Sequence, residues 1–134
     1  MQTYVINRTR HAAFLLHVHL VFVTKYRRKI LEELHLSAFH QYASEVCRDF
    51  GGELKESNGD ADHVHMLIEY PPTVQISVLV NSLKAVTSRR LRNEFQDLRE
   101  AYSKPVLWSR SYFAGSCGGA PLDVIKQYIQ HQRG

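Results

Sequence analysis

The clearest pattern along the chain is an alternation of apolar and polar residues at positions 62–69, which predicts a β-strand. Side chains two positions apart on a strand share a face, so His63 and His65 point the same way. The apolar residues between and after them point to the other side, toward a core. Two imidazoles at this spacing lie close enough to hold one cation between them, but they do not by themselves establish a metal site.

Hydrophobic periodicity predicts three more strands and three helices. The strands are at residues 14–24, 53–57 and 106–114, and the helices are at residues 32–50, 73–95 and 120–133. Gly51-Gly52 ends the first helix, and Asn58-Gly59-Asp60 predicts the turn of a hairpin that leads into the histidine strand. The segments without such a pattern are an irregular arm at 1–13, a polar connection at 96–105 and a glycine-rich link at 115–119.

The order of these elements is strand, helix, strand, strand, helix, strand, which is typical of a ferredoxin-like fold in the α+β class. We expect an antiparallel sheet with two helices on one face and the histidine pair on the other, open face. With 134 residues and no change in composition, the chain predicts a single domain over residues 1–134. Its core would span residues 14–114, and the additional C-terminal helix would span 120–133.

A second pair of histidines competes for the same role. His17 and His19 share a face of the first predicted strand, at the same spacing as the other pair. The pattern of residues alone does not decide which pair would hold a cation.

The composition favours a polyanionic partner. The formal net charge is +4, and the sequence pI is about 9.2. No apolar run is long enough for a membrane span and no signal peptide is evident, so we expect a cytoplasmic protein. Cys47 and Cys117 are far apart and lack metal-site spacing, which favours reduced thiols.

Two basic segments are candidates for contact with phosphates. The first follows a strand directly and consists of Lys25, Tyr26, Arg27, Arg28 and Lys29. The second is a stripe on the second long helix, where Asn81, Lys84, Ser88 and Arg92 recur at helical spacing, with Arg89 and Arg90 nearby. Charge runs are often solvated loops, but the position of the first segment directly after a strand favours contact with phosphate. The helix stripe is consistent with a solvated face, or with cations and hydroxyls that meet a phosphate backbone.

The final helix carries a further pair of polar side chains. Tyr128 and Gln132 are four positions apart, so they stack on one helix face beside the apolar stripe. A tyrosine in this position is often a packing residue. A hydroxyl and an amide oxygen together with two imidazoles would also suit a divalent cation that binds substrate oxygens.

Several motifs together resemble a known family. They are Thr24-Lys25-Tyr26-Arg27-Arg28-Lys29, Asp62-His63-Val64-His65, Asn81-Ser82-Leu83-Lys84, Leu107-Trp108-Ser109, Gly118-Gly119-Ala120-Pro121-Leu122 and Lys126-Gln127-Tyr128-Ile129. The chain resembles the single-tyrosine HUH transposases of small bacterial insertion sequences, of the IS200/IS605-like type. HUH stands for histidine–hydrophobe–histidine. The resemblance extends from His19 to Gln132, with the matched segments in the same order.

The resemblance implies specific roles and a specific reaction. His63, His65 and Gln132 would bind Mg²⁺ or Mn²⁺, Tyr128 would be the nucleophile, and His19 would not be a ligand. The enzyme would cleave and rejoin single-stranded DNA at hairpin-marked element ends through a 5′-phosphotyrosine. The relatives act as homodimers whose active sites are shared between subunits. The segment Lys25–Lys29 and the helix residues Lys84, Arg89 and Arg92 would hold DNA.

Three alternatives remain at this point. A ferredoxin-like sheet can also be a non-catalytic module that binds single-stranded nucleic acid through surface aromatics, which would give Tyr128 and Gln132 no role. A domesticated relative would process chromosomal palindromic repeats. A metal-dependent nuclease that uses water would leave no covalent adduct.

Overall fold

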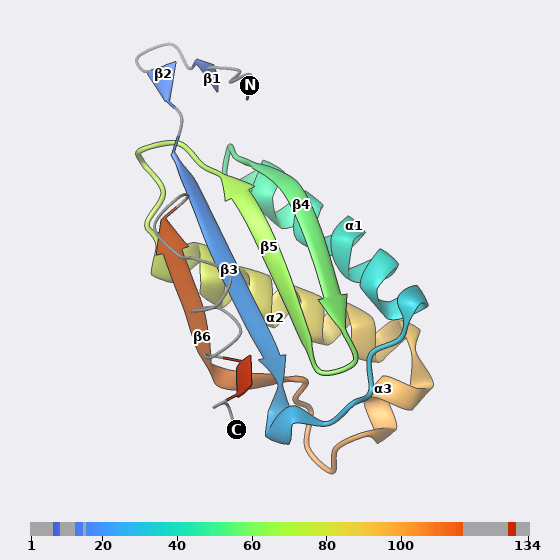
Figure 1. The fold of residues 1–134 in the computed structure, drawn as a ribbon. Coiled ribbons are helices and arrows are strands. Elements are labelled where there is room, and N and C mark those ends of the chain that lie inside the picture. Colours follow the sequence, from blue (N-terminus) through green and yellow to red (C-terminus); the bar gives the residue numbers. More distant parts are fainter. Residues whose placement is uncertain (1–6, 9–12, 15, 117–128, 131–134) are drawn as a thin grey trace.

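The computed structural model describes residues 7–8, 13–14, 16–116 and 129–130. Its main feature is a four-stranded antiparallel sheet with the order β4-β5-β3-β6. The strands are β3 (His17–Thr24), β4 (Glu53–Asp60), β5 (His63–Glu69) and β6 (Trp108–Ser116). The helices α1 (Glu33–Asp49) and α2 (Ile76–Glu94) cover one face of this sheet (Figure 1). The predicted ferredoxin-like α+β fold is confirmed.

The core between the sheet and the two helices fixes the register of the histidine strand. Alternate residues of β3 and β5 face the helices and are at most 5% exposed, namely Val18, Leu20, Phe22, Val64, Met66 and Ile68. Burial of each such side chain stabilises the fold by about 1.5–3 kcal/mol. A slip of one residue would move His63 and His65 into this core, so the apolar residues hold the histidines on the opposite face.

Trp108 fixes the start of β6 against α2. Its Nε1 donates to Oγ1 of Thr87 at 3.0 Å, and that hydroxyl donates to the Leu83 carbonyl at 2.6 Å. The indole ring also packs on Phe22 and Phe39, with ring centroids 5.7 Å away in both cases. These contacts place the residues around Trp108 at a fixed position beside the end of β3.

The turn between β4 and β5 differs from the prediction. Asn58-Gly59-Asp60 belongs to β4, and the turn is made by Ala61 and Asp62. A Cβ at Gly59 would lie 2.5 Å from the carbonyl oxygen of His63 and 2.9 Å from Leu36. The glycine is therefore used for a close approach of two strands and of α1, and it does not form the turn.

Other boundaries also differ near the ends of the elements. The first predicted strand is divided, because Ala13–Phe14 forms β2, which pairs with β1 (Asn7–Arg8), and β3 begins only at His17. Part of the predicted polar connection is the short helix α3 (Gln96–Glu100), whose Leu98 is fully buried. One leucine in a polar segment does not give a hydrophobic periodicity, so the sequence does not predict this helix.

The glycine-rich link begins later than predicted, because Gly115 and Ser116 belong to β6 and pair with β3. The rest of the link and most of the predicted final helix lie outside the described residues. Ile129 and Gln130 are described, and both are helical. None of the helices within the described residues is long and apolar enough to cross a membrane.

The histidine face of the sheet is less open than the sequence predicts. Val21 and Val23 lie on this face, opposite His65 and His63, and both are fully buried. They do not belong to the core cluster on the helix side. Buried apolar side chains thus lie next to the pair of histidines.

Candidate functional site

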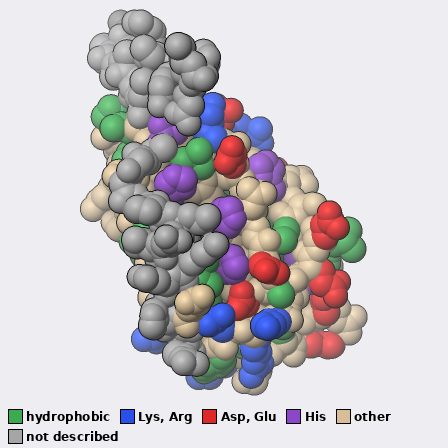
Figure 2. Space-filling view, viewed as in Figure 1, with side chains coloured by type: hydrophobic (Ala, Val, Ile, Leu, Met, Phe, Trp, Pro, Cys, Tyr) green, Lys and Arg blue, Asp and Glu red, His purple; other side chains and the backbone are tan. Residues whose placement is uncertain are grey.

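His63 and His65 lie side by side on β5. Their ring centroids are 6.3 Å apart, and the ring planes differ by 25°. In the sheet register they lie opposite Val23 and Val21, so both side chains are on the face away from α1 and α2. Figure 2 shows histidine side chains in a row along this face, with Lys and Arg side chains gathered at its lower end.

Asp62, in the hairpin turn, orients His63. Burial raises the pKa of Asp62, but hydrogen bonds from His63 and Arg27 outweigh this effect and leave the pKa below its usual value. The ionised carboxylate only accepts hydrogen bonds, so Nδ1 of His63 donates to Oδ1 at 2.9 Å. This bond leaves Nε2 of His63 as the nitrogen with a lone pair for a ligand.

The surroundings of His65 favour its neutral form. Its pKa is lowered by burial and by the positive charges that His63 and His19 carry when protonated, while Glu56 partly offsets this effect. A neutral imidazole is the form that binds a metal. His19 therefore affects this site, as expected for a residue of the neighbouring strand.

The second candidate pair is His17 and His19, and its two members have different neighbours. Nε2 of His17 is 3.9 Å from a carboxylate oxygen of Glu69, which is buried and also 3.5 Å from Lys55. Within the described ranges, no group of three or more His, Cys, Asp or Glu residues has the arrangement of a metal site. A metal ion at the His63–His65 pair would need a third ligand of another residue type or from outside these ranges. Tyr128 and Gln132 lie outside the described residues, so their predicted roles stay predictions.

Arg27 connects the histidine strand to the C-terminal segment. Its Nε donates to Oδ2 of Asp62 at 3.2 Å, and its Nη1 donates to the carbonyl oxygen of Gln130 at 2.9 Å. Gln130 follows Tyr128 by two positions in the sequence. The guanidinium of Arg27 is thus already bonded on two sides, and its predicted contact with DNA stays a prediction.

The turn that carries Arg27 has an unusual backbone. The 3₁₀ turn η1 (Lys25–Arg27) places Tyr26 at φ 61° and Arg27 at φ 53°, in the left-handed region. This conformation costs about 1–2 kcal/mol per residue for side chains other than glycine. The hydrogen bonds that hold it include those from Tyr102 Oη to the Lys25 carbonyl at 2.6 Å, from Thr24 Oγ1 to the Arg28 carbonyl at 2.7 Å and from the Lys25 amide to the Leu107 carbonyl at 2.9 Å.

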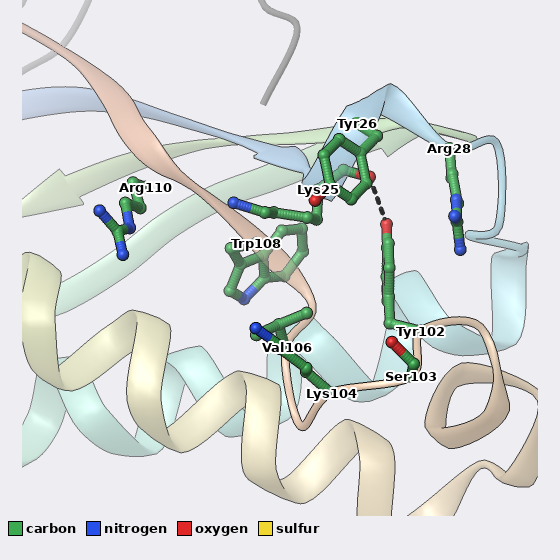
Figure 3. A pocket seen from close by; sticks show the side chains of 9 residues that line it. All are labelled: Lys25, Tyr26, Arg28, Tyr102, Ser103, Lys104, Val106, Trp108 and Arg110. Carbon is green, nitrogen blue, oxygen red and sulfur yellow. Dashed lines mark hydrogen bonds between the residues drawn. The ribbon is translucent and has the colours of Figure 1, made fainter.

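A pocket of about 330 Å³ lies on the other side of this turn (Figure 3), and we call it the turn pocket. Its lining residues come from η1 and the residue after it, from the segment after α3 and from the start of β6. They are Lys25, Tyr26, Arg28, Tyr102, Ser103, Lys104, Val106, Trp108 and Arg110. None of these residues is acidic and four are cationic, so the pocket has a positive potential.

A second hollow of about 430 Å³ adjoins the turn pocket, because Val106 and Trp108 line both. Its remaining lining includes the whole stripe singled out from the sequence, namely Asn81, Lys84, Ser88 and Arg92. Burial and the nearby charge of Lys25 lower the pKa of Lys84, whose Nζ donates to the Arg110 carbonyl at 2.8 Å. Arg89 is not a lining residue of the hollow, and Arg90 is paired with Glu45.

Sequence reasoning gave no role to Asp62, Tyr102, Lys104 or Arg110. Asp62 directly precedes the histidine pair, which is a usable signal because ligand histidines commonly bond a nearby carboxylate. Tyr102 and Lys104 lie in the segment predicted as a polar connection. They repeat the mixture of aromatic and cationic residues at positions 25–29, and that similarity was the available signal.

Known sequences of one family match most of this chain. The sequence model of the family described as "Transposase IS200 like" matches residues 12–132. The transposase for insertion sequence element IS200 of Salmonella typhimurium is 32% identical over 114 residues, which is 85% of this chain and 74% of that protein. The ISDra2 transposase TnpA of Deinococcus radiodurans is 27% identical over 135 residues, with 97% and 96% covered.

Two solved structures share the fold. A crystal structure of a candidate transposase from Deinococcus radiodurans R1 has a TM-score of 0.83 at 26% identity, over 96% of this chain and 98% of that chain. The structure of a REP-associated tyrosine transposase bound to a REP hairpin has a TM-score of 0.55 at 11% identity, over 98% and 70% of the two chains. The second likeness is one of fold alone.

Proposed function

Because this chain belongs to the IS200-like transposase family, we propose that it cleaves and rejoins single-stranded DNA at hairpin-marked ends through a 5′-phosphotyrosine on Tyr128. The observation that supports this proposal best is the hydrogen-bonded chain from His63 through Asp62 and Arg27 to the Gln130 carbonyl. It links a candidate metal ligand to the segment that contains the candidate nucleophile. A purely structural histidine pair would not require such a link.

The residues present suit a divalent cation. His63 and His65, with Gln132 as third ligand, would hold Mg²⁺ or Mn²⁺, and the ion would supply charge withdrawal from an oxygen of the scissile phosphate. Asp62 keeps the His63 ring in one orientation and one tautomer. The lowered pKa of His65 favours the neutral imidazole, whose lone pair can bind a metal.

In the proposed reaction, the phenol of Tyr128 is the nucleophile. The Tyr128 hydroxyl loses its proton and attacks phosphorus, so an oxygen–phosphorus bond to tyrosine forms while the bond to the 3′ oxygen breaks. The leaving oxygen takes up a proton and becomes a free 3′-OH. A 3′-OH from another strand reverses the step and rejoins DNA. One phosphodiester replaces another in each step, so no nucleoside triphosphate is consumed.

The proposal includes a homodimer in which the histidines of one subunit and Tyr128 of the other form each active site. We expect the sequence that follows β6, which includes Gly118 and Gly119, to allow such an exchange. The bond between Arg27 and Gln130 lies within one chain. In the shared arrangement the same bond would form between subunits.

A covalent-trapping experiment tests the proposed reaction. Single-stranded DNA from either side of the coding sequence, with its inverted repeats, is incubated with the protein and Mg²⁺ and then denatured in SDS. We expect a 3′-labelled strand to remain attached to the protein and a 5′-labelled strand to be released with a free 3′-OH. Tyr128→Phe should abolish the adduct, whereas Tyr70→Phe should not change it. Cleavage that persists in Tyr128→Phe would support a nuclease that uses water.

A further inference from the structure

We propose that the turn pocket binds one unpaired nucleotide of the substrate strand, with its base against the ring of Tyr26 and its phosphate among the surrounding cations. The inference rests on the proposed function only for the identity of the ligand as single-stranded DNA. It assigns a ligand to a part of the molecule that lies on the opposite side of η1 from the histidine pair.

The two tyrosines of the pocket differ in a way that suits stacking. Tyr102 is buried at 8% exposure, and its hydroxyl is bonded to the turn, so its ring is a fixed wall. Tyr26 is 60% exposed. Among the described residues, it is the one aromatic residue in the group of large exposed hydrophobic side chains. The ring centroids are 6.5 Å apart at an angle of 47°. Tyr26 thus offers an exposed ring flanked by the flexible side chains of Lys25 and Arg28. Stacking of one base on an aromatic ring is worth about 1–3 kcal/mol.

The backbone conformation of Tyr26 indicates that its exposed ring has a function. A tyrosine in the left-handed region is destabilising, and an exposed ring returns little hydrophobic stabilisation. The result of this conformation is that Tyr26 points into the turn pocket while the next residue, Arg27, points to Asp62 on the other side. Strain that places adjacent side chains on two different sites is typical of a binding segment.

Charge and size indicate a nucleotide and not merely an apolar ligand. Lys25 Nζ is 5.3 Å from the centre of the Tyr26 ring, and the Arg28 guanidinium carbon is 5.7 Å from it. A phosphate attached to a stacked base would lie close to both cations. A volume of about 330 Å³ is at the lower end of small-ligand pockets, which span roughly 300–1,000 Å³.

The adjoining hollow indicates how the strand continues. Its wall carries Lys84, Ser88 and Arg92, which are suited to phosphate contacts, and it meets the turn pocket at Val106 and Trp108. A base within a duplex is covered by its neighbours on both faces, so only an unstacked base can lie against Tyr26. The pocket therefore selects single-stranded DNA through stacking, and the hollow adds contacts that do not depend on sequence.

Trp108 provides a direct measurement, because it lines the pocket and is the single tryptophan of the chain. The full-length protein is titrated with a thymidine pentanucleotide and with an abasic strand that has the same number of phosphates. We expect saturable quenching of Trp108 fluorescence and about tenfold tighter binding of the strand that has bases. Tyr26→Asn, which tolerates the left-handed backbone, should lose this preference, while Tyr26→Phe should keep it.

Two controls make the result specific. Arg48→Ala removes an exposed cation at the far end of α1 and should leave both affinities unchanged. Circular dichroism should show the same fold for Tyr26→Asn as for the wild type. Equal binding of the two strands by the wild type, or an unchanged preference in Tyr26→Asn, would overturn the proposal. An adduct on Tyr128 without base-dependent quenching would reject nucleotide binding in the turn pocket but not the proposed reaction. Base-dependent quenching without an adduct would reject the proposed reaction but not nucleotide binding in the turn pocket.

Discussion

The two sides of the η1 turn are built in different ways. On one side, His63 and His65 stand on a regular strand whose register is fixed by the core. Asp62, which accepts a hydrogen bond from Arg27, orients His63 through a second hydrogen bond. On the other side, the turn pocket joins segments that are about 80 residues apart in the chain, on a backbone in the left-handed region. The first is a rigid arrangement suited to chemistry. The second is an aromatic and cationic surface suited to holding a strand.

This difference separates reaction from binding within a few residues. Arg27 serves the histidine side, whereas Lys25, Tyr26 and Arg28 serve the pocket side. Substitutions on the two sides should therefore affect different measurements.

His63→Ala should have the largest effect, because it removes a candidate metal ligand without changing the basic surface. We expect loss of cleavage with unchanged affinity for hairpin DNA, measured by adduct formation and by a gel-shift titration. His40→Ala is a matched control, since this exposed histidine of α1 bonds Ser57 and lies outside the site. Equal loss of cleavage and binding in a folded His63→Ala variant would contradict the separation.

Arg27→Lys should have an intermediate effect. Lysine keeps the charge but cannot bond Asp62 and the Gln130 carbonyl at the same time. Loss of one charge-assisted hydrogen bond of about 1.5–3 kcal/mol predicts at least about tenfold slower adduct formation. The salt dependence of DNA binding should stay the same, because the number of cations is unchanged. If Arg27→Lys cleaves at the wild-type rate, the two hydrogen bonds of Arg27 do not contribute to the reaction.

Tyr102→Phe should have the smallest effect and act on the pocket side alone. It removes the bond from the Tyr102 hydroxyl to the Lys25 carbonyl, which holds the turn. We expect a decrease of about 1 kcal/mol in the free energy of unfolding and weaker binding of the thymidine pentanucleotide. Urea denaturation measures the first effect, with Tyr70→Phe as the comparison. Slower cleavage of a saturating substrate would show that the two sides are coupled.

The contrast between the histidine strand and the turn pocket also explains which features the sequence predicts. The shared face of His63 and His65 follows from alternation, which is a local property with a period of two. The ferredoxin-like order of elements follows from periodicity in the same way. Gly59 was misassigned to a turn because its close approach to His63 depends on pairing between strands. The turn pocket was not predicted, because Tyr26 and Tyr102 meet only in the folded chain and the φ of Tyr26 has no sequence signature.

The most direct test of the proposed chemistry is to locate the covalent bond. After cleavage of single-stranded DNA, the protein is digested with nuclease and trypsin, and its peptides are analysed by mass spectrometry. Residues 127–133 lie between Lys126 and the bond after Arg133, so they form one tryptic peptide that contains Tyr128 as its single tyrosine. We predict that this peptide carries the added nucleotide. A nucleotide on a different peptide, or cleaved DNA with no modified peptide, would contradict the account.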